Sequence, residues 1–245
     1  ALMLIIITSY LSKWNKVKLI LLDKKNLFYL IFTSLLIFIN WSVWIYAVST
    51  NQIVDASFGY FIMPILSVLF GYLFFKELLN KRRIFAIILT IISVFYLFYF
   101  YKNFPWIGLT VGLSGSLYNV FRKKIKVDVD LGLLIESLII LPFALLGFYF
   151  VFQTGNLDFG INTLKLSLIL ILAGPMTVIP LFLYVRGVEL CGLGPTGMVF
   201  YITPTLQFLL GYFLYNEELD IHKLISFILI WIAVSIYLKD LYEKN

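Results

Sequence analysis

One carboxylate lies inside a strongly apolar stretch of the chain. Glu136 interrupts the run from Leu133 to Ile140 and lies about 8 Å beyond the start of a predicted helix over 131–152. A carboxyl group buried there could bind a proton, because burial favours its neutral form, or a cationic group, because an opposite charge favours its ionised form. The alternative is a side chain that extends back to lysines outside the run. The sequence leaves both interpretations open.

The amide of Asn40 is a second candidate group, well inside the apolar run 27–48. Trp41 is its neighbour and Trp44 follows one helical turn later, so the amide and the two rings could bind a small molecule. The competing interpretation is a hydrogen bond between helices, which polar side chains commonly form in membrane proteins. The residue types alone favour neither.

Two tyrosines lie close to prolines inside other apolar runs. Tyr60 precedes Pro64, and Tyr201 precedes Pro204. A proline lacks the backbone N–H and opens the helical hydrogen-bond ladder, so backbone carbonyls near either tyrosine could contact a ligand. The competing interpretation is that each ring fills space in the core and its hydroxyl is satisfied locally.

Further polar residues complete the candidate set. Thr203 and Gln207 lie four residues apart and therefore on one helix face, where they would line a cavity or bridge to a neighbouring helix. Tyr118 lies near the end of the run 104–121, and Arg186 follows the run 163–185. Both are candidates to contact a substrate, and for Arg186 the alternative is a side chain that does not face the cavity.

Composition places these groups in a membrane protein. Hydrophobic residues make up 62% of the chain and charged residues 13%, far from the balance of a soluble domain. A spanning helix needs about 20 mostly apolar residues. The candidate helices cover 27–48, 55–75, 84–101, 104–121, 131–152, 163–185, 193–215 and 224–238, and the apolar run 1–12 is too short to span. The fold class is therefore an all-α polytopic membrane protein.

An internal repeat indicates what kind of membrane protein this is. Positions Ile62, Pro64, Leu66, Leu69, Gly71, Tyr72, Glu77 and Leu79 recur, 140 positions later, as Ile202, Pro204, Leu206, Leu209, Gly211, Tyr212, Glu217 and Leu219. Repeated halves, each with a proline-interrupted helix in the same place, are typical of secondary transporters. Glu77 and Glu217 end the matched helices, and we expect each to cap or pair with the helix that follows.

The repeat also predicts the helix count. The same shift pairs 27–48 with 167–188, 55–75 with 195–215 and 84–101 with 224–241, whereas 104–121 has no partner. We therefore expect a ten-helix transporter fold of five plus five helices, lacking helix 1 and part of helix 2 here. Its repeats are 1–101 and 104–242, and five helices in each force the two to be inverted.

Charge placement predicts the orientation. Basic loops are expected at 13–25, 76–83 and 122–126, and only Lys102, Lys165 and Lys223 of the 19 Lys and Arg residues fall on the opposite side. The basic side, with the C-terminus, is therefore cytoplasmic. The net charge of +6 then faces anionic lipid rather than nucleic acid. Arg122 could attract an anion, but Lys123 and Lys124 beside it favour a basic cluster that sets topology.

Several stretches resemble a known family. They are Asn40-Trp41, the run from Asp55 to Pro64, Lys76-Glu77-Leu78, Arg122-Lys123-Lys124-Ile125, and the run from Tyr201 to Leu206. These are similar to RarD-type proteins in the EamA branch of the drug/metabolite transporter superfamily, over nearly the whole chain. The resemblance implies ten helices in two inverted repeats, an inner-membrane location, and export or exchange of small metabolites.

The most specific function these features support is a secondary transporter that moves a small metabolite or drug-like solute by alternating access. A membrane scaffold or sensor and a small multipass enzyme are the alternatives. A single cysteine, Cys191, and a single histidine, His222, predict neither a metal site nor a cofactor. The expected partners are a small-molecule substrate and the lipid bilayer, with a homodimer left open and nucleic acid excluded.

Overall fold

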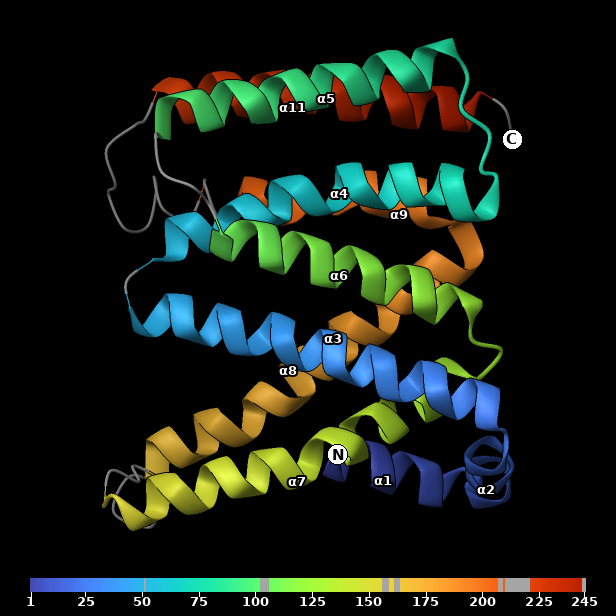
Figure 1. Cartoon of the computed structure of the whole chain (residues 1–245), viewed down its shortest axis with the longest axis vertical. Helices are drawn as coiled ribbons and strands as arrows, with labels where there is room; N and C mark the ends of the chain where they lie inside the picture. The colour runs from blue at the N-terminus through green and yellow to red at the C-terminus, as the bar shows by residue number, and fades with distance from the viewer. Residues whose placement is uncertain are drawn as a thin grey trace. The chain divides into compact units, whose positions relative to one another are not determined.

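The computed structural model describes residues 1–50, 52–101, 106–155, 159–160, 164–206, 209 and 221–243, and these contain helices but no strand. Figure 1 shows the helices in chain order. They are α1 (Leu2–Tyr10), α2 (Trp14–Leu22), α3 (Lys24–Ser49), α4 (Ile53–Phe75), α5 (Lys81–Tyr101), α6 (Trp106–Lys124), α7 (Val129–Gln153), α8 (Leu164–Cys191), α9 (Leu193–Val199) and α11 (Ile221–Tyr242).

The prediction of an all-helical, multi-pass membrane protein is confirmed. Among the described residues, five helices are long and apolar enough to cross a membrane: Lys24–Ser49, Lys81–Phe100, Val129–Gln153, Leu164–Cys191 and Leu224–Tyr242. A shorter apolar helix covers Gly59–Phe75 within α4. Backbone polar groups in a bilayer must be satisfied internally, which explains why these runs are helical.

The predicted basic loop at 13–25 is wrong in one respect, because it contains helix α2. Val17 on this helix is buried, and this apolar contact favours a helix over an exposed loop. Asp23 then begins the next helix: its carboxylate accepts the backbone N–H groups of Lys25 and Asn26 at 3.0 and 3.2 Å. An aspartate in this position satisfies donors that have no partner inside the helix.

The described chain forms two compact units, one made of 1–38 and 121–187 and the other of 39–120 and 188–245. Each unit contains segments from both predicted repeats. In the first unit α1 packs against α7. The salt bridges Lys13–Asp130 (2.6 Å) and Lys16–Asp128 (3.1 Å) fix the chain between α1 and α2 to the start of α7.

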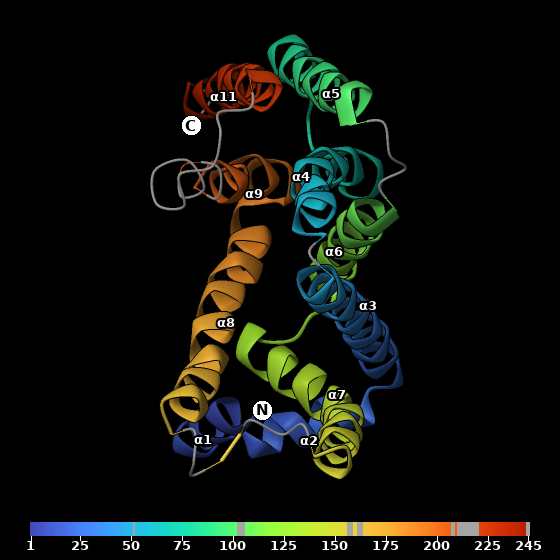
Figure 2. The same cartoon turned by 90° about the vertical axis from the view of Figure 1, so that its left-hand side faces the viewer.

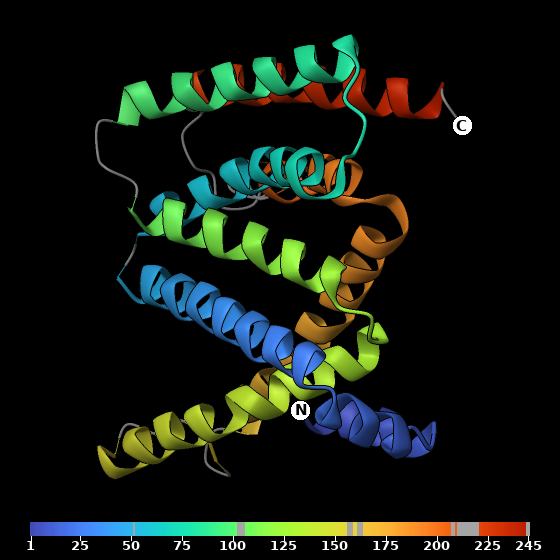
Figure 3. The ribbon, with the colours of Figure 1, turned by 45° about the vertical axis from the view of Figure 1, so that its right-hand side comes forward.

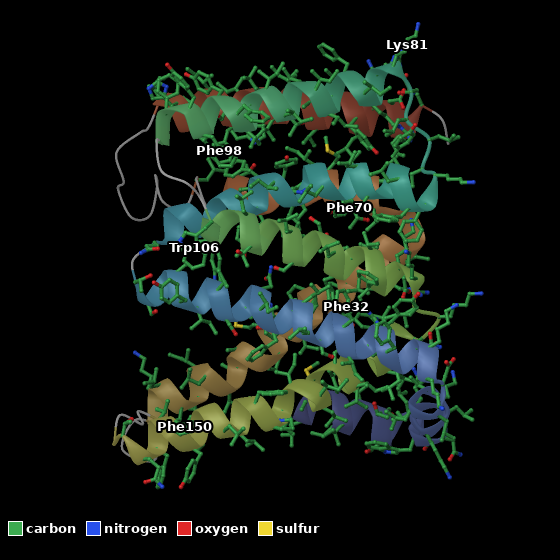
Figure 4. All side chains as sticks on the ribbon, viewed as in Figure 1. Phe32, Phe70, Lys81, Phe98, Trp106 and Phe150 are labelled. Atoms are coloured by element: carbon green, nitrogen blue, oxygen red, sulfur yellow. The ribbon has the colours of Figure 1, made fainter. Side chains whose placement is uncertain are left out.

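The second unit is organised around two helix pairs. Helix α4 packs against α9, and α5 packs against α11, as the views in Figures 2 and 3 also show. Buried apolar side chains fill the space between them, among them Phe61, Val68, Leu97, Met198 and Ile230. In Figure 4 Lys81 marks one end of α5 and Phe98, packed on this core, lies near the other.

Both pairs are antiparallel. Near the start of α5, Arg83 pairs with Asp240 at the end of α11 (2.8 Å), and near the end of α5, Tyr96 bonds His222 at the start of α11 (2.9 Å). In the other pair, an atom added at Gly197 of α9 would meet Ser67 of α4. The end of α4 lies beside the start of α9, as the Glu77 contacts described below show.

These paired helices occupy equivalent places in the repeat. Helix α4 begins at residue 53, and α9 begins 140 positions later, at 193. Equivalent residues also touch each other. The rings of Tyr60 and Phe200 are 5.7 Å apart, and the Tyr201 hydroxyl donates to the Phe61 carbonyl at 2.8 Å.

The two prolines act differently on their helices. Helix α4 continues through Pro64, whereas α9 ends at Val199 and a further helical stretch covers 202–206. In the second case Pro204 has no N–H to offer the carbonyl of Phe200, and the N–H of Thr203 donates to that carbonyl instead, at 2.9 Å. The prediction of a broken or kinked helix is therefore confirmed for the second repeat, where the helix breaks after Val199. In the first repeat α4 is continuous through Pro64.

Glu77 joins α4 to α9. Its two carboxylate oxygens accept the backbone N–H groups of Leu193 and Gly194 at 2.7 and 2.9 Å. The first N–H groups of a helix have no acceptor within the helix, and a carboxylate can accept their hydrogen bonds. Its negative charge is also attracted to the partial positive charge of the helix N-terminus. We expected Glu77 to cap or pair with the helix that follows it, and the helix that it caps is α9, far along the chain. Glu217 lies outside the described residues.

Replacing Glu77 by alanine should loosen the start of α9. Loss of a capping side chain costs about 0.5–2 kcal/mol of unfolding free energy, and amide exchange at Leu193 and Gly194 should speed up. Hydrogen exchange and denaturant unfolding in detergent measure both. Glu243→Ala, which removes an exposed carboxylate paired with Arg82, is the control. Equal exchange at Leu193 in both variants would contradict the capping role.

Candidate functional site

The first unit buries the Glu136 carboxylate. The side chain is 3% exposed and lies on the first two turns of α7, which are almost wholly buried. Thr33 of α3 donates its hydroxyl to Glu136 Oε1 at 2.6 Å and also contacts the carbonyl of Leu30 in its own helix. Two helices far apart in sequence therefore meet at one buried acid.

Arg122, at the end of α6, supplies the opposite charge. Its Nε lies 3.7 Å from Glu136 Oε1, and the side chain is 1% exposed. Gly132 of α7 provides the room, because a Cβ atom there would lie 2.2 Å from the Arg122 Nη1. A charged pair out of water needs both partners, since either charge alone would be strongly unfavourable.

This contact corrects one expectation, for Arg122, and bears on the two interpretations that the sequence leaves open for Glu136. Arg122 is not part of a solvated basic cluster, although Lys124 two residues later is exposed. Glu136 contacts Arg122 and Thr33 rather than extending to lysines, and Lys13 and Lys16 instead pair with Asp130 and Asp128. Lys13 and Lys16 are thus paired with aspartates at the start of α7, and Glu136 forms its ion pair with Arg122.

In the second unit the Asn40 amide bridges two helices. Its Nδ2 donates to the Val111 carbonyl at 2.8 Å and to the Ser114 hydroxyl at 2.9 Å, both on α6. This is the hydrogen bond between helices that the sequence left as one of two interpretations. A bond of this kind holds the amide in a fixed orientation, which is compatible with either a packing or a binding role.

An aromatic group lies near this amide along α3. The Trp44 ring contacts Tyr60 at 5.1 Å, and Tyr60 contacts Phe200 at 5.7 Å. Trp44 and Tyr60 are half-buried, whereas Trp41 is 41% exposed and lies on the surface of the unit. The structure thus brings Trp44 and Tyr60 together and leaves Trp41 outside the group.

The remaining candidates are spread over the two units. Tyr201 is buried with its hydroxyl bonded to Phe61, and Thr203 is half-buried two residues later. Tyr118 is buried on α6, and Arg186 is exposed on α8. Gln207 lies outside the described residues. Within the described ranges no cluster of His, Cys, Asp or Glu could hold a metal ion.

Sequence reasoning missed Thr33 and undervalued Arg122. Thr33 lies seven residues before Asn40, and this spacing places both polar side chains on one face of α3. That periodicity was the available signal. Arg122 carried no comparable signal, because its burial depends on the space beside Gly132 and on the distant acid.

The comparisons with known proteins agree with the helical membrane fold. A family model described as "EamA-like transporter family" matches residues 1–99. The chain is 32% identical over 237 residues to "Protein RarD" of Salmonella typhi, an alignment that covers 97% of this chain and 81% of that protein. The chain belongs to the EamA-like transporter family.

Its relatives within the family are RarD proteins and transporters. "Protein RarD" of Escherichia coli is 31% identical over 97% of this chain and 80% of its own length. An "Uncharacterized transporter" of Vibrio cholerae is 34% identical over 93% of this chain and 76% of its own length. The chain is accordingly a RarD-type member of a transporter family.

Replacing Thr33 by valine should test whether the hydroxyl supports the buried acid. The variant keeps the shape but leaves Glu136 with one donor fewer, so the free energy of unfolding should fall by about 1–2 kcal/mol. Ser34→Ala is the matched control, because Ser34 bonds only a carbonyl of its own helix, Leu30, at 2.6 Å. Unfolding in detergent measures both, and equal losses would contradict a specific Thr33–Glu136 bond.

Proposed function

We propose that this EamA-family protein is a secondary transporter that moves a small metabolite or drug-like solute across the cytoplasmic membrane by alternating access. The direction is export or exchange. Family membership supports transport in general, and the observation that carries the finer proposal is the buried Glu136 with its two partners, Thr33 and Arg122. Ionisable groups inside membrane helices are costly, and they typically mark ion or substrate pathways.

Glu136 is the group that couples transport to a proton or a cation. Its carboxylate has a hydroxyl donor at 2.6 Å and a guanidinium at 3.7 Å. When Glu136 binds a proton it no longer attracts Arg122, so the contact between α6 and α7 weakens. A change in charge at one atom can thereby bias two arrangements of these helices, which alternating access requires.

The architecture is a ten-helix fold of two inverted repeats, covering 1–101 and 104–242 of this sequence. The antiparallel pairs α4 with α9 and α5 with α11 support it, because equivalent helices of inverted repeats run in opposite directions. The contacts Tyr60–Phe200 and Tyr201–Phe61 support it further. Residues on a two-fold axis meet their own equivalents in this way.

The proposed substrate contacts are the polar and aromatic groups that the sequence singles out. They include Glu136, Asn40, Trp44 and Tyr60. Trp41, Tyr118, Arg186, Tyr201, Thr203 and Gln207 complete the assigned set. The lipid bilayer is the second partner and a homodimer is compatible with the fold, whereas nucleic acid is not a partner.

The orientation places the start of α5 and the C-terminus in the cytoplasm, because the basic residues gather on that side. Thr50 and Lys81 flank α4, so cysteines placed at the two positions should react from opposite sides of the membrane. The background is Cys191→Ser, since Cys191 is exposed. Labelling of whole cells with an impermeant maleimide should modify Thr50→Cys alone, and modification of both positions would contradict the topology.

Replacing Glu136 by glutamine should abolish proton-coupled transport. The variant keeps the shape and the contact with Thr33 but cannot change charge. In liposomes that enclose a pH dye, solute-driven proton movement should fall to the level of empty liposomes, while the protein remains folded in the membrane. Asp128→Asn, an exposed acid of the same unit, is the control. An unchanged pH profile for the Gln variant would place the coupling site elsewhere.

A further inference from the structure

The guanidinium of Arg122 has unused hydrogen-bonding capacity. All three of its nitrogen atoms are buried, and none has a hydrogen-bond acceptor in the part of the chain that the structure describes. The contact with Glu136 at 3.7 Å is an attraction between charges but is too long for a hydrogen bond. The buried positive charge is therefore balanced, whereas its N–H donors are not.

Such an arrangement is unfavourable unless something else occupies the donors. A guanidinium carries five N–H groups in a planar fork. A buried donor without an acceptor loses its hydrogen bonds to water and gains none in the protein, which lowers the stability of the fold. The neighbourhood is also shaped for this side chain, because Gly132 leaves the space in which the guanidinium lies. An arginine kept in a fitted site with free donors is typical of a site for an oxyanion.

We propose that Arg122 binds the carboxylate group of the transported solute, so that the substrates are small organic acids. This inference rests on the proposed transport function and names the substrate class of the same site. The fork of the guanidinium matches the two oxygens of a carboxylate and binds them with two parallel hydrogen bonds. The anion would occupy donors that Glu136 does not reach.

Charge favours a monocarboxylate over a phosphate. Arg122 contributes one positive charge and ionised Glu136 one negative charge, so an added monoanion gives a neutral site once Glu136 binds a proton. A dianionic phosphate would leave an excess negative charge among apolar helices, which is unfavourable. Two other cations of this unit, Lys13 and Lys16, are already paired with Asp130 and Asp128.

Glu136 then competes with the substrate. The ionised acid attracts Arg122 and repels a second carboxylate, whereas the neutral acid does neither. Glu136→Gln should therefore strengthen binding of an organic acid, even though it abolishes proton coupling. Arg122→Gln should weaken binding. A purely structural ion pair predicts the same direction for both variants, which makes the two opposite effects diagnostic.

The probes are acetate and benzoate, with acetamide and benzamide as neutral isosteres. Binding to the purified full-length protein in detergent is measured by thermal shift over a concentration series. We expect the acids to stabilise the wild type and the amides to have no effect. Arg122→Gln should weaken the apparent affinity for the acids roughly 10-fold or more, and Glu136→Gln should strengthen it.

Gly132→Ala and Lys124→Gln complete the set. The first changes no charge but displaces the guanidinium, and it should weaken binding as Arg122→Gln does. The second removes an exposed cation two residues from Arg122, and it should bind acids as the wild type does. If Arg122→Gln fails to fold, the opposite shifts of Gly132→Ala and Glu136→Gln carry the test.

Two results would overturn the inference: neither acid stabilises the wild type, or Arg122→Gln and Gly132→Ala bind the acids as the wild type does. The outcome is separable from the transport function. Arg122-dependent binding without solute flux would leave the substrate class standing and reject transport. Flux without Arg122-dependent binding would leave transport standing and reject organic acids as the substrates.

Discussion

A charged side chain among apolar helices needs a partner of opposite charge, because its surroundings provide almost no solvation. In one compact unit this requirement joins three helices. Arg122 lies in the last turn of α6, Glu136 lies in the first turns of α7, and Thr33 of α3 donates to the same carboxylate. Gly132 leaves the space for the guanidinium. Any change in the charge of Glu136 therefore alters how these helix segments attract one another, and the proposed transport mechanism rests on this change.

The other unit is held together by a different set of contacts. Four of its helices form two antiparallel pairs with an apolar core, and polar side chains bond specific helix ends and faces. Glu77 satisfies the first N–H groups of α9, and Asn40 bonds a carbonyl and a hydroxyl of α6. These bonds fix the positions of helix ends and helix faces. The half-buried rings of Trp44 and Tyr60 lie in this fixed framework, where a solute could stack on them.

Patterns within the sequence predicted the elements well, because helix formation in a membrane follows from apolar length. The repeat at 140 positions predicted which helices are equivalent, and α4 and α9 begin 140 positions apart, as it requires. Contacts between distant segments were beyond the sequence. Glu77 caps α9 because α4 and α9 pack antiparallel. Arg122 is buried because α7 presents a glycine beside it. Neither fact is encoded in local spacing. The sequence indicates Asn40 as a candidate binding residue, whereas its partners on α6 depend on how the two helices pack.

Whether Arg122 and Glu136 truly interact is best tested by a double-mutant cycle on the unfolding free energy. The variants are Arg122→Gln, Glu136→Gln and the double variant. Each is unfolded in lipid–detergent mixtures, and transport is not measured. Removing one partner of a buried pair strands the other charge and costs about 3–5 kcal/mol, whereas removing both costs much less. A direct pair therefore predicts a double variant that is more stable than either single variant. Additive losses within about 0.5 kcal/mol would mean that the two side chains act independently, and the buried pair would not be the contact that organises this unit.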